Sequence, residues 1–407
     1  MKFKDYRISK DIKKAIEELG WSRPTDIQFK AIQPILDGED VLAIAQTGTG
    51  KTASFVIPIL NTLSKNANKY NTGGVSCLVL VPTRELAIQI DDVFREVGKY
   101  LTFKSMALTG GVDQDPQIFK LKTHVDIVIS TPGRMFDMIS QGHLKVDQLK
   151  TLVLDEADHM LDLGFVKDIK DLMRHIPQKR QTLFFSATIN KEIKKVAYDL
   201  VRNAIRIQIS PKNPVAKNIV HSVAFVEMDD KRFFLENIVK EHSDLKVIVF
   251  VRTKVRAERL VKAMERVQLK SETIHGDVDQ KERFAILNRF KSGENKLLIT
   301  TDVAARGIDI PNVGAVVNYD LPDVAENYVH RVGRTGRGKE KGWAISLCSE
   351  QEKSFLKEIE DYTGSEIPVY DLSKSDYQSI VDDSEAGDYD WKSLIAENDL
   401  WAKEKKK

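Results

Sequence analysis

The stretch AQTGTGKT (residues 45–52) follows the apolar run Val41–Ala45 and opens a segment whose apolar residues have helical spacing. A glycine-rich turn between a strand and a helix presents successive backbone N–H groups to a phosphate. In this setting Lys51 would reach the β- and γ-phosphates, and the Thr52 hydroxyl would help to hold Mg²⁺. Ala45 stands where the usual phosphate-loop pattern begins with glycine, but a lysine-threonine pair at the helix start disfavours a turn without a ligand. The predicted nucleotide contacts of this loop are Gln46, Thr47, Gly48, Thr49, Gly50, Lys51 and Thr52.

Short apolar runs rich in β-branched residues alternate with longer amphipathic segments along most of the chain. Continuous apolar strands separated by helices indicate a parallel sheet covered on both faces. Residues 210–217 contain two prolines and no periodicity, which is typical of an interdomain linker. We therefore predict an α/β protein with domains at residues 1–209 and 218–365, and an acidic tail at 366–407. The expected strands are Val41–Ala45, Cys77–Val81, Val125–Ser130, Thr151–Asp155, Thr182–Ser186, Val223–Val226, Lys246–Val251, Lys296–Thr301, Ala315–Tyr319 and Ala344–Cys348.

The composition limits the class of protein. A hydrophobic share of 42% and a charged share of 30% are those of a soluble globular chain. Because 62 Lys and Arg residues face 60 Asp and Glu residues, any nucleic-acid site must concentrate its basic residues locally. Cys77 and Cys348 lie in separate apolar runs and cannot form a zinc cluster or a disulfide framework. No signal peptide or run long enough to span a bilayer is present, so we expect a cytoplasmic protein.

An acidic tetrad, Asp155-Glu156-Ala157-Asp158, follows the apolar run that begins at Thr151. A carboxylate at a strand tip beside a phosphate loop is how a nucleotide hydrolase holds Mg²⁺, which assigns that role to Asp155 together with Thr52. Glu156 is then placed to orient the attacking water. Three acids within four residues repel one another unless a cation is near, which favours a metal site over a solvated acidic loop.

The tetrad and the modified phosphate loop together resemble the DEAD-box ATP-dependent RNA helicases of superfamily 2. The resemblance continues in the same motif order to about residue 365. It implies two tandem RecA-like domains, each a mainly parallel sheet with helices on both faces, and RNA-stimulated hydrolysis of ATP. The other segments that carry it are Gly20–Gln28, Pro82–Leu86, Thr109–Gly111, Thr131–Arg134, Ser186–Thr188, Val249–Thr253, His275–Asp277, Gln280–Arg283, Thr301–Asp309 and His330–Arg337.

The resemblance implies further nucleotide contacts. The Gln28 amide would pair with the N6 and N7 edge of adenine, and Phe3 would stack on the purine. Asp309 would accept a hydrogen bond from the ribose. Arg334 and Arg337 of the second domain would reach the γ-phosphate, so that hydrolysis requires the domains to close. The predicted catalytic residues are Lys51, Asp155, Glu156, Arg334 and Arg337.

Two further groups follow from the same resemblance. The coupling group comprises Asp158, Ser186, Thr188 and His330, because the hydroxyls of Ser186 and Thr188 can hydrogen-bond Asp158 and transmit the state of the nucleotide. The second group mixes Pro, Thr, Gly and Arg with few aromatic residues, which suits contacts to phosphates and 2′-hydroxyls rather than to bases. These predicted RNA contacts are Pro82, Thr83, Arg84, Gly110, Gly111, Thr131, Arg134, Arg252, Thr253, Gly276, Thr301 and Arg306.

The leading hypothesis is therefore an ATP-dependent RNA helicase that binds RNA without sequence preference and locally separates short duplexes. The alternatives are an ATP-gated RNA clamp with little unwinding, which carries the same motifs, and a DNA translocase. The tail also has two interpretations, a loosely docked segment or a helix that binds a protein partner or a domain. Trp391, Leu394, Ile395 and Trp401 would share one face of that helix.

Overall fold

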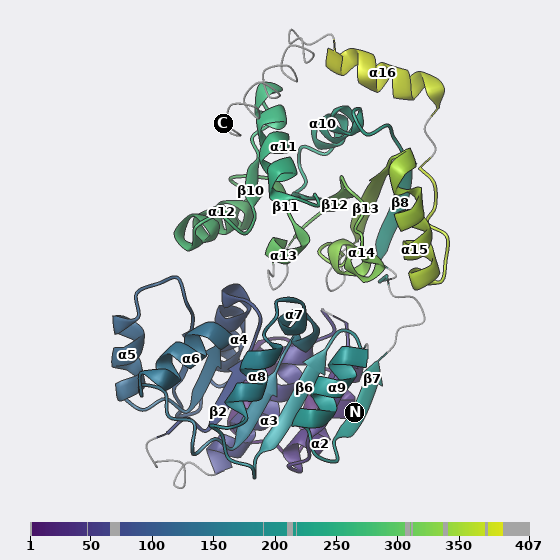
Figure 1. The fold of residues 1–407 in the computed structure, drawn as a ribbon. Coiled ribbons are helices and arrows are strands. Elements are labelled where there is room, and N and C mark those ends of the chain that lie inside the picture. The colour runs from purple at the N-terminus through teal and green to yellow at the C-terminus, as the bar shows by residue number, and fades with distance from the viewer. Residues whose placement is uncertain are drawn as a thin grey trace. The chain divides into compact units, whose positions relative to one another are not determined.

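The computed structural model describes residues 2–46, 48–65, 74–189, 191–209, 215–216, 218–305, 310, 312–336, 341–370 and 373–385. The chain divides into two compact units, which separate between residues 212 and 213 (Figure 1). Each unit is an α/β structure and is described by itself. Among the described residues, no helix has the combination of length and apolarity that crossing a membrane requires.

The first unit is built on a seven-stranded sheet with the strand order β3-β4-β2-β5-β6-β1-β7. All neighbouring strands are parallel, so their carboxyl ends meet at one edge of the sheet. That edge receives the glycine-rich loop after β1 and the acidic tetrad after β5. The strands are β1 (Val41–Ala45), β2 (Cys77–Leu80), β3 (Ser105–Leu108), β4 (Ile127–Ser130), β5 (Thr151–Leu154), β6 (Gln181–Ser186) and β7 (Ile205–Ile209).

Helices cover both faces of this sheet (Figure 1). Side chains of α1 to α4 pack in one core, and those of α6 to α9 pack in the other. The helical elements are η1 (Phe3–Asp5), α1 (Lys10–Glu18), α2 (Asp26–Leu36), α3 (Lys51–Lys65), α4 (Arg84–Val97), α5 (Asp115–Lys122), α6 (Pro132–Ser140), α7 (Ala157–Asp162), α8 (Val166–Leu172) and α9 (Lys191–Leu200).

Strand β1 shows why the central strands are apolar throughout. Successive side chains of a strand point to opposite faces of the sheet. Val41 and Ala43 accordingly pack in the core with α1 to α4, whereas Leu42 and Ile44 pack in the core with α6 to α9. Burial of a large aliphatic side chain contributes about 1.5–3 kcal/mol, so each central strand anchors helices on both sides. The loops at the carboxyl edge are thereby held on a rigid base.

The second unit repeats this plan with a six-stranded parallel sheet in the order β10-β11-β9-β12-β13-β8. Side chains of β9 pack with those of α10 and α11 in one of its cores. The strands are β8 (Ile219–Phe225), β9 (Val247–Phe250), β10 (Glu272–Ile274), β11 (Leu297–Thr300), β12 (Ala315–Asn318) and β13 (Gly342–Cys348). The helical elements are α10 (Lys231–Glu241), α11 (Lys254–Arg266), α12 (Gln280–Ser292), α13 (Asp302–Ala305), α14 (Ala325–Val332), η2 (Glu350–Glu352), α15 (Lys353–Thr363) and α16 (Lys374–Glu385).

Three strands are missing from the sequence prediction, and several strand boundaries differ from it, with the largest difference at the start of β8. Strands β3, β7 and β10 were absent from it, because each lies at the edge of its sheet and mixes polar with apolar residues. In β7 only Ile207 is buried, so the strand lacks a continuous apolar run. Strand β8 begins at Ile219 rather than at Val223, and its early residues His221 and Ser222 are polar and partly exposed, so they interrupt the apolar run. Most of the predicted linker lies outside the described residues.

The beginning of the predicted tail forms helix α16, which packs on α10. The Tyr377 ring lies 4.9 Å from the Phe234 ring, between their centroids. The Tyr377 hydroxyl donates a hydrogen bond to Asp230 Oδ2 at 2.7 Å. Residues up to Glu385 are thus a docked helix. The tail residues predicted to share a helical face, from Trp391 onward, lie outside the described residues.

Candidate functional site

The glycine-rich loop places a cation in a buried position without a hydrogen bond. Lys51 is 6% exposed, and none of the described residues forms a hydrogen bond with its Nζ. Gly48 and Gly50 have φ angles of 80° and 90°, a region that side chains rarely adopt. The loop thus combines backbone freedom with an unsatisfied buried ammonium, which suits a bound phosphate. Thr47 lies outside the described residues.

Gln28 connects helix α2 to this loop. Its Oε1 accepts a hydrogen bond from the Thr25 backbone N–H at 2.9 Å, and its Nε2 donates to the Gly50 carbonyl at 3.1 Å. A Cβ at position 50 would lie 2.5 Å from that Nε2, so glycine is required here for close packing as well. A contact between Gln28 and adenine, as predicted, must share or replace one of these bonds.

Phe3 occupies a different environment from the one its predicted role requires. It is 4% exposed and belongs to the core of the first unit, with its ring centroid 6.3 Å from that of Tyr6. Stacking on a purine stays a prediction, and it would require this ring to move out of the core. Trp21, the aromatic residue of the predicted adenine-reading segment, is only partly buried against the same core.

The acidic tetrad begins at the end of β5, next to β6 in the sheet. Burial, reinforced by the charges of Glu156 and Asp158 and opposed by the Lys51 ammonium, raises the pKa of Asp155 to about 6. Glu156 has φ 51° and ψ 48°, a left-handed conformation that costs a non-glycine residue about 1–3 kcal/mol. Its backbone N–H donates to Asp155 Oδ1 at 2.9 Å. A buried carboxylate whose charge Lys51 compensates only in part fits a site for a divalent metal ion.

The members of the coupling group in the first unit, Asp158, Ser186 and Thr188, lie together, but through different atoms from those predicted. Asp158 Oδ2 accepts hydrogen bonds from the backbone N–H groups of Ala187 at 3.0 Å and Thr188 at 3.1 Å. Thr188 N–H also lies 3.4 Å from Ser186 Oγ. The contact of Asp158 with the segment after β6 is therefore made by main-chain amides, whereas the prediction gave it to the hydroxyls of Ser186 and Thr188. The backbone makes this contact because the carboxylate lies at the amino end of the turn that follows the strand.

The predicted RNA contacts of the first unit gather at the ends of β3, β4 and β2, beside the nucleotide group. Thr83 caps α4, since its Oγ1 accepts from Leu86 N–H at 3.3 Å. Arg84 packs against Gly110 and Gly111, and a Cβ at position 111 would lie 1.9 Å from Arg84 Nη1. Pro82 and Thr131 stand at the ends of β2 and β4 on the same edge.

Arg134 adds a buried donor to this group. Its Nη2 donates to the Val112 carbonyl at 3.0 Å. Its Nη1 is buried and makes no hydrogen bond with any described residue. An unsatisfied guanidinium nitrogen beside glycine-rich loops fits an anionic ligand such as a backbone phosphate.

The second unit presents an equivalent group at the ends of β10, β11 and β9. Thr253 caps α11 as Thr83 caps α4, with its Oγ1 accepting from Arg256 N–H at 3.2 Å. Gly276 and Thr301 follow β10 and β11, and Arg252 follows β9. Because β10, β11 and β9 are consecutive in the sheet, these four residues lie along one half of its carboxyl edge.

His330 and Arg334 lie at the end of α14 in the same unit. Arg334 is 8% exposed, and its Nε donates to the His330 carbonyl at 3.2 Å. Between them, Arg331 is buried and forms a two-point ion pair with Asp302, with distances of 2.6 and 2.7 Å. Three other predicted residues, Arg306, Asp309 and Arg337, lie outside the described residues.

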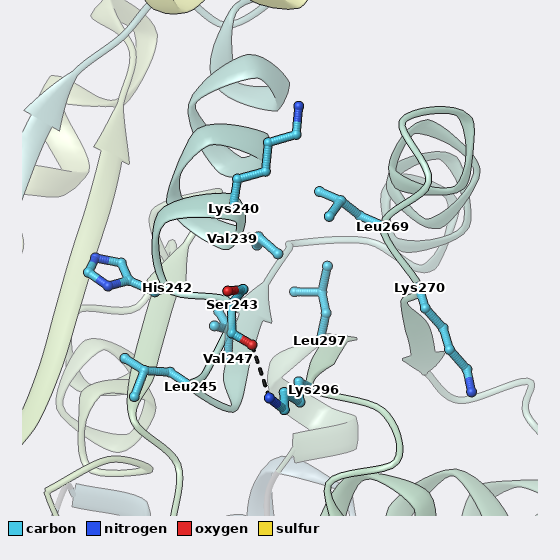
Figure 2. Close-up of a pocket in the computed structure, with 10 residues that line it drawn as sticks. All are labelled: Val239, Lys240, His242, Ser243, Leu245, Val247, Leu269, Lys270, Lys296 and Leu297. Atoms are coloured by element: carbon cyan, nitrogen blue, oxygen red, sulfur yellow. Dashed lines mark hydrogen bonds between the residues drawn. The ribbon is translucent and has the colours of Figure 1, made fainter.

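A pocket of about 290 Å³ in the second unit is separate from these groups (Figure 2). It contains Val247 and Leu297, the first residues of β9 and β11, so it lies at the amino edge of the sheet. Figure 2 shows Lys296 Nζ hydrogen-bonded across it to the Ser243 carbonyl, at 3.1 Å. None of the predicted site residues lines this pocket.

Residues 25–196 match the family model of the DEAD/DEAH box helicase, and residues 230–339 match that of the helicase conserved C-terminal domain. ATP-dependent RNA helicase DbpA of Bacillus subtilis is 40% identical over 365 residues, which cover 90% of this chain and 75% of the relative. The chain belongs to the DEAD-box family of ATP-dependent RNA helicases. It is an RNA-stimulated ATPase, and the predicted family and tandem RecA-like fold are confirmed.

Other relatives and solved structures support the same family assignment. DEAD-box ATP-dependent RNA helicase CshA of Geobacillus kaustophilus is 39% identical, over 89% of this chain and 76% of the relative. Among solved structures, DEAD-box helicase Mss116 bound to ssRNA and UDP-BeF aligns with a TM-score of 0.83 and 29% identity, covering 93% of this chain and 81% of that one. S. cerevisiae Dbp5 bound to RNA and ADP BeF3 gives 0.81 and 29%, covering 93% and 99%.

The sequence did not reveal the structural roles of two residues near the predicted sites. Gln117 of α5 holds the main chain at Thr109, because its amide accepts from Thr109 N–H and donates to Thr109 carbonyl, both at 3.1 Å. Arg331 was read only as part of an arginine-rich turn, yet it is 1% exposed. The pairing of Arg331 with Asp302 could have been suspected only from the rule that a buried arginine needs an acidic partner.

Proposed function

We propose that this helicase binds RNA without sequence preference and separates short duplexes locally, using ATP to close its two domains. The observation that carries the proposal is the division of one sheet edge into two groups. The loops after β5, β6 and β1 hold the acidic tetrad, the coupling segment and the glycine-rich loop, and those after β3, β4 and β2 hold the predicted RNA contacts. The neighbours β2 and β5 join the two halves, so events in one group can affect the other.

In the proposed nucleotide site, Lys51 binds the β- and γ-phosphates, and its buried ammonium gains the partner that it lacks among the described residues. Thr52 and Asp155 would hold Mg²⁺, which when bound offsets negative charge on the phosphates. Glu156 orients the attacking water, and its left-handed backbone fixes where the carboxylate points. Arg334 and Arg337 stabilise the transition-state charge after closure, a contribution on the order of a thousandfold in rate.

In the proposed RNA track, guanidinium groups and helix amino termini of both domains contact sugar and phosphate groups. The caps Thr83 and Thr253 orient two of these helix termini at matching positions of the two sheets. Few aromatic residues accompany them, so we propose that the track contacts the RNA backbone and does not distinguish bases.

We also propose domain boundaries at residues 1–209, 218–365 and 366–407, with the linker at 210–217. We further propose that the protein is cytoplasmic and that the tail binds a protein partner.

Replacement of Glu156 tests the catalytic assignment. Glu156→Gln keeps the side-chain shape and removes the charge, so turnover should fall at least 100-fold while ATP and RNA binding persist. RNA-stimulated phosphate release and fluorescence anisotropy of labelled RNA measure the two properties. Loss of RNA and ATP binding along with turnover would contradict the assigned role.

A strand-displacement assay separates the helicase from the ATP-gated RNA clamp. A helicase releases the short strand of a labelled duplex with ATP, whereas a clamp holds RNA with an ATP analogue and releases little strand. Equal stimulation of ATP hydrolysis by RNA and by DNA of the same sequence would favour a DNA translocase instead.

A further inference from the structure

The second unit contains a buried ion pair at the carboxyl edge of its sheet. Lys231, the first residue of α10, is 0% exposed, and Glu352 of η2 is 1% exposed. The Lys231 ammonium contacts Glu352 Oε2 and donates to the Tyr319 carbonyl at 2.8 Å. Glu352 Oε2 also accepts from the backbone and hydroxyl of Ser349, at 3.1 and 2.9 Å. Burial of two charges is costly, so a pair with this many bonds has a defined geometry.

The other oxygen of the same carboxylate binds an arginine of the predicted RNA track. Glu352 Oε1 accepts from Arg252 Nη2 at 3.2 Å and from Leu321 N–H at 3.2 Å. The guanidinium lies 5.5 Å from the centroid of the Phe355 ring, on its face. Glu352 thus contacts Lys231 on one side and Arg252 on the other, and a rigid acid holds a cation at the surface.

Arg252 keeps part of its guanidinium available. Its side chain is 30% exposed, and the backbone N–H is fixed separately by Asp320 Oδ2 at 3.0 Å. Burial favours neutral Glu352, but the Lys231 ammonium and the Ser349 hydrogen bonds outweigh it and lower the pKa of this carboxyl. The anchor is therefore anionic at neutral pH. An arginine held by one nitrogen and one ring face loses less conformational freedom when its remaining N–H groups bind a phosphate.

We propose that Glu352, fixed by Lys231, is a positioning residue that orients the Arg252 guanidinium toward a phosphate of bound RNA. This inference rests on the proposed RNA track and adds to it two buried residues that touch no RNA. It predicts that RNA affinity depends on an ion pair in the interior of the second unit, whereas ATP binding to the first unit does not.

A thermodynamic cycle tests the proposal in the full chain. Arg252→Ala should weaken binding of labelled single-stranded RNA about tenfold, with the ATP analogue present, and lower the slope of log affinity against log salt by about 1. The double variant Lys231→Met/Glu352→Gln removes the anchor without leaving an unpaired buried charge, and should weaken RNA binding about fivefold. Adding Arg252→Ala to that double variant should then cost only about twofold more, because its target is already misplaced.

An ion pair on the same helix gives the matched control. Lys240 and Glu236 of α10 are 2.6 Å apart, and neither contacts Arg252. Lys240→Met/Glu236→Gln makes the same chemical changes and should leave RNA affinity within twofold. This control should keep the native affinity for the ATP analogue, the native kcat at saturating RNA and the native RNA concentration for half-maximal stimulation. Arg252→Ala and the anchor variant should raise that RNA concentration while the affinity for the ATP analogue persists.

Each outcome bears on one claim. If Arg252→Ala leaves RNA affinity unchanged, the proposed RNA contact is wrong at this position. If Arg252→Ala weakens binding but the anchor variant does not, the positioning role of Glu352 is refuted and the RNA track stands. Should the anchor variant fail to fold, Phe355→Leu replaces it: removing the ring face at constant charge should weaken RNA binding two- to threefold, and an unchanged affinity overturns the proposal.

Discussion

The environment of Asp155 predicts a stability that depends on pH in a definite direction. Its pKa is about 6 in the folded chain against an ordinary 3.8, so the folded state holds the proton more tightly than the unfolded state. As pH rises from about 4 to 6, the unfolded chain loses this proton first and folding is disfavoured. The full cost above pH 6 is about 3 kcal/mol, from two pKa units at 1.36 kcal/mol each.

Asp155→Asn removes this titration, because an amide stays neutral at every pH of interest. In nucleotide-free protein with EDTA, the variant should therefore gain stability relative to the native chain as pH rises. The expected gain grows by about 1.5 kcal/mol between pH 5 and pH 8, since about half of the cost is already present at pH 5. Any constant cost of a poorly hydrogen-bonded amide cancels in this difference.

Hydrogen exchange of the amides in β5 measures the opening free energy of this unit at each pH. Lys51→Met provides a second arm, because the loss of the nearby ammonium raises the pKa of Asp155 further and should steepen the dependence in an otherwise native chain. A stability difference between Asp155→Asn and the native chain that stays constant from pH 5 to pH 8 would refute the reasoning.

Three further changes have defined outcomes. Gly111→Ala should weaken RNA binding at least fivefold with ATP binding intact, because a Cβ there displaces Arg84; Gly142→Ala, which has a similar φ of 72° but an open surrounding, controls for backbone strain in the same anisotropy assay. At pH 5, where Asp155 is largely protonated and gains little from the Lys51 charge, Lys51→Met should raise the unfolding midpoint of nucleotide-free protein in a thermal scan and should also abolish ATP binding; a lowered midpoint would argue against an unsatisfied ammonium. Tyr377→Phe should cost about 1 kcal/mol and speed hydrogen exchange in α16, and unchanged exchange would show that its hydroxyl does not hold the helix.

The sequence was most informative where chemistry dictates residue type. The central strands were predicted because both of their faces are buried, which leaves no polar positions in runs such as Cys77–Leu80. The acidic tetrad and the glycine-rich loop were placed correctly at strand ends for the same reason: each directly follows such a run. Edge strands escaped prediction because the predicted strands were continuous apolar runs, whereas β7 is exposed at three of its five positions and alternates isoleucine with polar residues.

The side-chain contacts within the site could not be predicted in the same way. The sequence showed that Asp158 and the Ser186–Thr188 segment belong together, but not that main-chain amides make the bond, because any residue supplies an amide. The burial of Phe3 depends on how η1 packs on the core of the first unit, which is a tertiary effect. Glu352 was invisible for another reason: its partners, Lys231 and Arg252, lie more than 90 residues away in the chain.

The order of strands in the first sheet also determines which loops can tolerate substitutions during evolution. The predicted RNA contacts lie in loops after β3, β4 and β2, and the predicted nucleotide and coupling residues lie in loops after β5, β6 and β1. The two sets meet where β2 pairs with β5. The loops after β3 and β4 are two or more strands away from β5, which carries the predicted hydrolytic residues. Substitutions in these two loops can therefore accumulate while hydrolysis is preserved. Thr83 follows β2, which pairs with β5, so substitutions near Thr83 are more prone to disturb hydrolysis. The loops after β3 and β4 are therefore the best positions at which to alter RNA binding without changing ATP hydrolysis.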